Sequence, residues 1–149
     1  MKSSYNLPCN IAQTLNIIGD KWSLLIIHEL AIGHNTYKEI QNGLTGIPTN
    51  LLSTRLKELE SDGLLVSRLY QNHPPRYQYE LTESGAELYH VFYALILWGE
   101  KYLQHDKCYK RLVHKDCGHS IEQQYYCPHC HQVVNKDDMA VVDIAQITE

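Results

Sequence analysis

The sequence predicts an α+β fold, and three observations support this prediction. Apolar residues recur at helical spacing and give one helix a single buried stripe: Leu52, Leu56 and Leu59. Two strand-like runs, at 64–70 and 76–81, lie on either side of two prolines, as expected of a β-hairpin with a stiff tip. Four of the five cysteines lie in the last third of the chain. Together these features predict a winged helix-turn-helix domain followed by a small, separate module.

Four helices are expected before the hairpin. Two helices rich in apolar residues are expected at 11–18 and 21–30, and that richness predicts burial on most sides. A shorter helix at 37–43 and a turn lead into the leucine-striped helix, where Pro48 suits the first turn because its missing N–H costs no hydrogen bond there. Gly63 falls just past that helix, at a position where a left-handed residue commonly ends a helix.

One long helix is expected after the hairpin. Thr82 can cap a helix that runs from about 83 to 104. The apolar residues of this helix are three or four positions apart: Leu88, Val91, Phe92, Leu95, Trp98 and Tyr102. A helix at the end of a small domain cannot bury an apolar stripe this large within that domain. We therefore expect the helix to dock onto a second subunit.

The polar face of the leucine-striped helix indicates contact with nucleic acid. Short polar side chains and a cation can enter a major groove without clashing, and this face carries Asn50, Ser53, Thr54 and Lys57. The net charge of −4 argues mildly against phosphate binding, yet residues 45–77 hold four basic side chains against three acidic ones. The acids cluster late in the helix, at the end expected to point away from DNA. We therefore expect moderate, salt-sensitive binding that needs two copies of the domain.

The composition also limits which cellular compartment and which kinds of chemistry are expected. No apolar run approaches the roughly 20 residues needed to cross a bilayer, and the first residues lack the apolar stretch of a signal peptide. We therefore expect a cytoplasmic protein without a membrane partner, in which cysteines favour metal binding or thiol chemistry over structural disulfides. No Ser/His/Asp arrangement, phosphate-binding glycine loop or carboxylate pair indicates an enzyme.

From Cys9 to Trp98 the chain resembles the HxlR-type winged-helix transcription regulators, a branch related to the MarR-like factors. The residues and segments that carry the resemblance are Cys9, 18–27, Glu29, Leu30, 37–40, Gly46, Ile47, 50–60, 63–65, Arg68, 74–79, Leu81, Thr82 and Gly85. The resemblance implies a homodimer, held by the first and last helices, that binds a palindromic operator in double-stranded DNA near the promoters it controls. Repression is the usual outcome, and the small-molecule or oxidant effector is unknown.

The resemblance also implies which side chains meet DNA. The matching positions of the recognition helix are Thr49, Asn50, Ser53, Thr54 and Lys57. In the wing, Arg76 matches a contact with the minor groove or its phosphates. Arg55 sits closer to the leucine stripe, so a phosphate contact and an ion pair with Glu58 or Glu60 are both open.

The tail pairs histidine and cysteine at metal-binding spacing. The pattern is His-x2-Cys, nine residues, then Cys-x2-Cys, and zinc prefers four such ligands at tetrahedral corners. The expected ligands of a structural Zn²⁺ are His114, Cys117, Cys127 and Cys130. The alternatives are His119, His129 or His131 in place of His114, and Cys108 as a further candidate. We expect a zinc-ribbon-like module at 106–149 that follows a winged-helix DNA-binding and dimerisation domain at 1–105.

Two cysteine features have competing interpretations. Cys127 and Cys130 enclose Pro-His, the active-site sequence of some thiol-disulfide oxidoreductases, but that chemistry needs a thioredoxin-like fold with the motif at the head of a helix. Cys9, just before the first helix, matches the position of an oxidant- or electrophile-sensing cysteine in some HxlR-type proteins. Its alternative role is that of a small apolar residue beneath the dimer interface.

The function we expect is therefore that of a sequence-specific, homodimeric DNA-binding regulator, most often a repressor. The main alternative is an adaptor that resembles a general transcription factor and uses winged helix and ribbon for protein contacts. A regulator prefers one palindrome by ~10³-fold or more, whereas an adaptor shows little sequence preference. A thiol-disulfide oxidoreductase that uses Cys127 and Cys130 is the third candidate.

Overall fold

The computed structural model describes residues 4–103 and 109–143. By its internal contacts the chain separates into two compact units, Met1–Phe92 and Tyr93–Glu149, and each unit is described by itself. The domain boundary expected from composition, between residues 105 and 106, lies outside the described residues and stays a prediction. None of the helices in the described ranges is long and apolar enough to cross a membrane.

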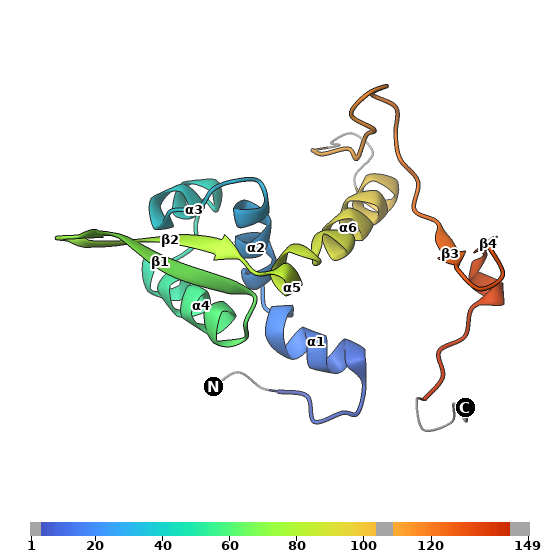
Figure 1. Cartoon of the computed structure of the whole chain (residues 1–149), viewed down its shortest axis with the longest axis horizontal. Coiled ribbons are helices and arrows are strands. Elements are labelled where there is room, and N and C mark those ends of the chain that lie inside the picture. The colour runs from blue at the N-terminus through green and yellow to red at the C-terminus, as the bar shows by residue number, and fades with distance from the viewer. Residues whose placement is uncertain (1–3, 104–108, 144–149) are drawn as a thin grey trace. The chain divides into compact units, whose positions relative to one another are not determined.

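The first unit is a winged helix-turn-helix, as the sequence predicts (Figure 1). Its elements are α1 (Asn10–Ile18), α2 (Ser23–Ala31), α3 (Tyr37–Gly43), α4 (Thr49–Ser61), β1 (Leu65–Asn72), β2 (Pro75–Leu81) and α5 (Glu83–Ala86). β1 and β2 pair antiparallel, with an irregular register between Leu69 and Gln71. An isolated bridge between Thr36 and Gln78 ties the start of α3 to this hairpin. The hairpin and the helix-turn-helix therefore form one connected structure.

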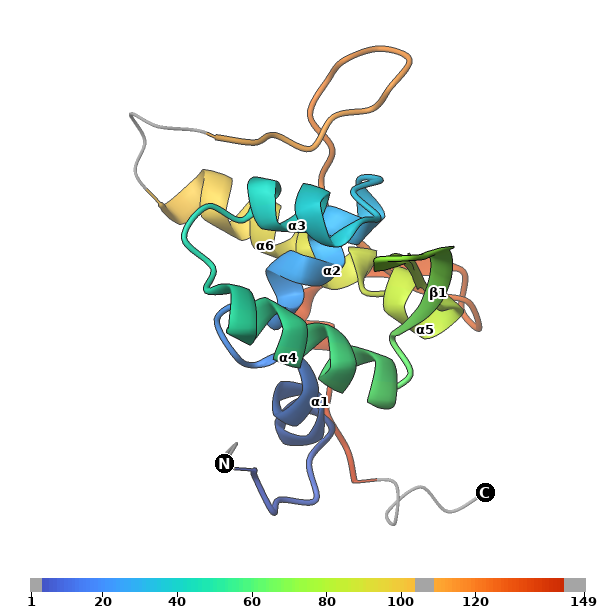
Figure 2. The same ribbon diagram turned by 90° about the vertical axis from the view of Figure 1, so that its left-hand side faces the viewer.

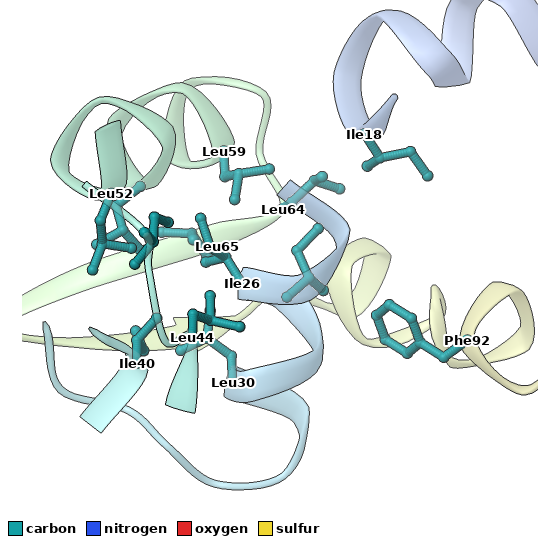
Figure 3. Close-up of a cluster of buried hydrophobic side chains, with 13 residues drawn as sticks. Ile18, Ile26, Leu30, Ile40, Leu44, Leu52, Leu59, Leu64, Leu65 and Phe92 are labelled. Carbon is teal, nitrogen blue, oxygen red and sulfur yellow. The ribbon is translucent and has the colours of Figure 1, made fainter. Parts of the chain in front are cut away.

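The core of the first unit lies between α2, α4 and the hairpin (Figure 3). Ile26 of α2 is fully buried, and Leu52, Leu56 and Leu59 of α4 are each no more than 2% exposed. The leucine stripe is thus confirmed. Because burial of one leucine side chain stabilises a fold by about 1.5–3 kcal/mol, these three residues fix how α4 is rotated about its own axis. The polar face of α4 must then point away from the core.

Local hydrogen bonds determine where the helices of the helix-turn-helix begin. Thr36 and Glu39 form a capping box at the start of α3. α4 begins one residue later than expected, because Pro48 is its N-cap, with extended backbone at φ −63° and ψ 139°. The carbonyl of Pro48 accepts the first helical hydrogen bond from the N–H of Leu52 at 2.9 Å. Gly63 follows α4 with φ +76°, the left-handed conformation that its position predicts.

The single long helix expected at 83–104 is wrong, because the structure divides it into α5 and α6 (Tyr89–Tyr102). Thr82 does cap a helix, but that helix is the four-residue α5, where its hydroxyl accepts from the N–H of Gly85 at 3.2 Å. Past α5 the N–H groups of Leu88 and Val91 bond to carbonyls three residues back. This tighter turn interrupts the helix while the apolar spacing continues across it. The expected end of the long helix, at residue 104, lies outside the described residues.

The second unit contains two small hairpins in the range 109–143. One is marked by a bridge between Val113 and Ser120. The other consists of β3 (Tyr125–Cys127) and β4 (Gln132–Val134), which pair antiparallel, and a 3₁₀ turn, Lys136–Asp138, follows it. Within 109–143 no residue is buried, and only Leu112, Cys127 and Val134 are half-buried. These hairpins form without a hydrophobic core of their own.

Candidate nucleic-acid interface

The outer face of α4 carries the five side chains that the sequence assigns to DNA contact. Figure 2 looks onto α3, α4 and β1, which lie on one face of the first unit. The predicted residues of the recognition helix are all exposed: Thr49, Asn50, Ser53, Thr54 and Lys57. Asn50, Thr54 and Lys57 lie opposite the buried leucines, whereas Thr49 and Ser53 lie closer to the leucine side of the helix. The exposure of all five agrees with the sequence prediction. The surface they form is polar, with one cation.

Two hydroxyl groups on this face already donate their protons within the protein. The hydroxyl of Thr54 donates to the carbonyl oxygen of Asn50 at 2.9 Å. The hydroxyl of Ser53 donates to the phenol oxygen of Tyr37 at 3.4 Å. Each hydroxyl oxygen therefore presents lone pairs outward, and such acceptors match the amino groups that cytosine and adenine expose in the major groove.

Tyr37 fixes the start of α4 relative to α3. Its hydroxyl donates to the backbone carbonyl of Thr49 at 2.7 Å, twelve residues along the chain. The ring is half-buried and packs against the hydrophobic core. The first turn of a recognition helix carries its base contacts. This hydrogen bond therefore helps to fix the position of that turn relative to α3.

Arg55 points into the protein and joins α4 to the segment before α2. Its Nε lies 3.3 Å from Oδ1 of Asp20, and its guanidinium also pairs with Glu58. Its side chain is only 16% exposed, so of the alternatives left open by the sequence the structure selects an intramolecular ion pair with Glu58. Glu60 instead accepts hydrogen bonds from the backbone N–H and the hydroxyl of Ser67, both at 2.7 Å.

Asp20 belongs to the segment 18–27, which carries the family resemblance but indicates no role for this residue. The structure supplies a role. One of its carboxylate oxygens accepts from the backbone N–H groups of Trp22 and Ser23, at 2.9 and 3.1 Å, and so caps the start of α2. Burial alone would raise the pKa of Asp20, but hydrogen bonds from Ser23 and Trp22 and the charge of Arg55 outweigh it and lower the pKa below 3.8. The carboxylate thus holds α2 and α4 together.

The wing carries its exposed cation near the tip. Arg76 is exposed and pairs in register with Gln71. Arg68 lies 3.2 Å from the carboxylate of Glu80, so part of the basic charge counted from the sequence is balanced within the hairpin. Arg76, rather than Arg68, is therefore the wing residue best placed to meet a phosphate.

A cleft of about 670 Å³ separates α3 from the wing, and it contains a residue that sequence reasoning missed. The cleft is lined by Thr36, Tyr37, Lys38, Glu39, Asn42, Tyr70, Pro75, Arg76, Tyr77 and Tyr79. Lys38 is exposed in the first turn of α3 and faces the same space as Arg76. The sequence position of Lys38 could have indicated a DNA contact. Lys38 lies on the helix before the recognition helix, and the first helix of such a unit crosses the DNA backbone.

Cys9 lies at the edge of the first unit. It is the N-cap residue of α1, it is exposed, and its carbonyl accepts from the N–H of Gln13 at 3.0 Å. The preceding segment is tied to α1, since the side-chain amide of Gln13 donates to the carbonyl of Leu7 at 2.8 Å. The Cys9 thiol is therefore held at a fixed place and is open to solvent.

The tail residues predicted to bind metal form two separate pairs. Nδ1 of His114 lies 3.3 Å from Sγ of Cys117. Hydrogen bonds from the backbone and thiol of Cys130, and from the backbone of His129, lower the pKa of Cys127. Across the described residues no group of three or more histidine, cysteine or acidic side chains comes together as a metal site. The alternative ligand Cys108 lies outside the described residues.

The Cys127–Cys130 pair does not have the setting of an oxidoreductase. Cys127 ends β3, and Cys130 stands in the turn before β4. Thiol-disulfide oxidoreductases carry this motif at the head of a helix, where the helix dipole stabilises the first thiolate. The third candidate function, a thiol-disulfide oxidoreductase that uses Cys127 and Cys130, therefore lacks the helix that its chemistry needs.

A helix-turn-helix with an exposed polar second helix and a cation at the wing tip defines a winged-helix DNA-binding protein. The sequence profile of the HxlR-like helix-turn-helix family matches residues 17–107, and the chain belongs to that family. It is a transcriptional regulator with a helix-turn-helix DNA-binding domain, a class that is typically not enzymatic.

Similar proteins fall into two groups by length. The uncharacterized HTH-type transcriptional regulator Mb3122 of Mycobacterium bovis is 33% identical over 122 residues, which cover 81% of this chain and 77% of Mb3122. The transcription factor PA1607 has a similar structure, with a TM-score of 0.78 and 29% identity over 92% of this chain and 96% of its own. The redox regulator HypR, in its oxidized form, has a TM-score of 0.59 and 30% identity over 64% of this chain and 99% of its own. The PA1607 match thus extends into the tail, which the HypR match is too short to include.

Proposed function

We propose that the protein binds a palindromic operator as a homodimer and represses the nearby promoter. α4 enters the major groove, where Asn50 and Lys57 face base edges. Arg76 and Lys38 approach the phosphates on either side of the cleft between α3 and the wing. The observation that carries this proposal is the exposed polar face of α4, held in place by its buried leucines and flanked by two exposed cations.

Exposed apolar side chains on two helices support the homodimer. On α1, Ile11 is 71% exposed and Leu15 is 43% exposed. On α6, Leu95, Trp98 and Tyr102 are 52%, 56% and 60% exposed. Apolar stripes of this kind are costly to leave in water, and a second copy of the same chain supplies a complementary apolar surface.

Selection from a random pool of duplex DNA tests this proposal. With reduced, full-length protein we expect enrichment of a two-fold symmetric site whose half-sites are centred one helical turn, about 10 base pairs, or a multiple of it apart. Lys57→Glu should abolish the enrichment, whereas Lys136→Glu, in the second unit, should preserve it. If the wild-type chain enriches no sequence, the regulator is excluded and the adaptor becomes the better account.

We further propose that Cys9 makes operator binding sensitive to oxidants. Its exposed, fixed thiol and the similarity to the redox regulator HypR support this role. Hydrogen peroxide would join the Cys9 thiols of two subunits in one disulfide and be reduced to two water molecules. Peroxide should then weaken operator binding by the wild-type protein but not by Cys9→Ser. An equal response of the two proteins would exclude Cys9 as the sensor.

A further inference from the structure

The C-terminal hairpins need a source of stability that the structure does not otherwise provide. Not one residue in the range 109–143 is buried, although this stretch forms two defined hairpins. A segment this short buries too little apolar surface to offset the entropy of ordering its chain. Small modules of this kind are usually held by disulfides or by a structural metal. The four described cysteines form no disulfide, and the spacing of histidine and cysteine in this stretch favours a structural metal.

The first hairpin brings one histidine and one cysteine together at its turn. The N–H of His114 donates to the carbonyl of His119 at 2.9 Å, and the N–H of Gly118 donates to the carbonyl of His114 at 2.8 Å. Gly118, directly after Cys117, has φ +72°, which favours glycine and makes the tight turn possible. The 3.3 Å between Nδ1 of His114 and Sγ of Cys117 is close to the separation of about 3.5 Å that a tetrahedral zinc imposes on a nitrogen and a sulfur ligand.

The second hairpin repeats this arrangement with two cysteines. Cys127 ends β3 and Cys130 lies in the turn that leads to β4, and His131, directly after Cys130, has φ +54°. The backbone N–H groups of His129 and Cys130 donate to the sulfur of Cys127. Each hairpin therefore presents two ligands at its turn.

One of the histidines near these cysteines lies directly against a cysteine sulfur. Nδ1 of His114 lies 3.3 Å from Sγ of Cys117. Nδ1 of His119 instead lies 3.0 Å from the carbonyl oxygen of Cys117, and Nδ1 of His131 lies 3.0 Å from the hydroxyl of Tyr126. The contact with the sulfur is the reason to place His114 in the ligand set.

We propose that Nδ1 of His114 and the thiolates of Cys117, Cys127 and Cys130 bind one Zn²⁺, which joins the two C-terminal hairpins into a single folded module. Three sulfurs and one imidazole nitrogen suit tetrahedral zinc, and four protein ligands leave no open position, so the site is structural. Each cysteine releases its thiol proton to solvent as it binds. This proposal does not depend on operator binding.

Metal content and ligand spectroscopy test the proposed set. Full-length protein, stripped of metal and reduced, should take up one zinc per chain, and Co²⁺ should give the intense visible bands of a tetrahedral site with sulfur-to-cobalt charge transfer. His114→Ala, Cys117→Ser, Cys127→Ser and Cys130→Ser should each weaken or abolish these bands, whereas Cys9→Ser, Cys108→Ser and His119→Ala should retain them. No zinc uptake, or cobalt bands that survive both His114→Ala and Cys117→Ser, would overturn the proposal.

Proteolysis tests whether the metal folds the module. Zinc should protect the range 109–143 of the wild-type protein from cleavage, and a chelator should remove that protection while the first unit stays intact. Equal cleavage with and without zinc contradicts metal-coupled folding.

Discussion

At the scale of single residues, Asp20 connects the recognition helix to the rest of the domain. Its carboxylate caps α2 and pairs with Arg55 of α4. Asp20→Ala should destabilise the first unit by about 1–3 kcal/mol, because the cap is lost and a mostly buried guanidinium loses one partner. Thermal or urea unfolding measures this loss. Asp62→Ala, at an exposed position in the same unit, is the matched control and should change stability by less than about 0.5 kcal/mol.

The lowered pKa of Asp20 also predicts how stability depends on pH. A carboxyl group whose pKa is lower in the folded state stabilises the fold above its unfolded pKa of about 3.8, and this contribution disappears as pH falls through the lower folded pKa. Between pH 5 and the acid transition, roughly the window of such linkage, wild type should therefore lose stability more steeply than Asp20→Asn. Parallel stability curves for the two proteins would show that Asp20 is not held ionised by its partners.

The residues of the α4 face were predictable, but the roles of the charged residues around them were not. Helical spacing alone places Asn50 and Lys57 opposite the leucines, and the structure agrees. The Arg55–Asp20 pair joins residues far apart in sequence, so no local pattern reveals it. Lys38 becomes a candidate only when the hairpin is folded back beside α3, as the cleft between them shows.

At the scale of elements, the junction between the hairpin and α5 depends on a close backbone approach. A Cβ atom at position 85 would collide with the carbonyl oxygen of Leu64, the same carbonyl that accepts from the N–H of Thr82. Gly85→Ala should therefore force a backbone shift and cost about 1–3 kcal/mol, measured by urea unfolding. Gly99→Ala on α6 is a suitable control, since its added methyl would meet only the flexible side chain of Leu103. Equal stability of wild type and Gly85→Ala would refute this account of the junction.

The break between α5 and α6 shows what periodicity cannot predict. The apolar spacing from Leu88 to Tyr102 continues without a gap, and Thr82 is a good cap, so one helix is the natural expectation. The break instead comes from tertiary contacts, because Gly85 is pressed against the backbone of Leu64, the residue before β1, and Phe92 is buried in the core. Contacts between distant segments thus override a pattern that is correct for each helix taken alone.

At the scale of the whole molecule, the proposed binding to a palindromic operator requires two copies of the chain. Trp98 is 56% exposed on α6, and the proposed homodimer would bury it between the two subunits. Trp98→Arg should convert dimers to monomers in light scattering and weaken operator binding at least tenfold, because each half-site is then bound separately. Leu69→Arg, on the wing, should leave the mass unchanged. A wild-type monomer would contradict the assignment, as would a Trp98→Arg variant that stays dimeric.

The two units differ in how far their sequences determine them. The first unit has a buried core whose spacing reveals its helices and strands, and family membership confirms the winged helix. The second unit has no buried residue in 109–143, so apolar spacing carries little information about it. There the spacing of cysteine and histidine is the main signal.

The central claim is that α4 reads sequence while the wing supplies affinity that is independent of sequence. The most direct measurement is the ratio of affinities for the selected operator and a scrambled duplex, compared among wild type, Asn50→Ala and Arg76→Ala at one salt concentration. Asn50→Ala should lower this ratio about 5–100-fold, as loss of a bidentate base contact does. Arg76→Ala should weaken both affinities alike and keep the ratio. If both variants lower the ratio equally, or neither does, the division between α4 and the wing is wrong.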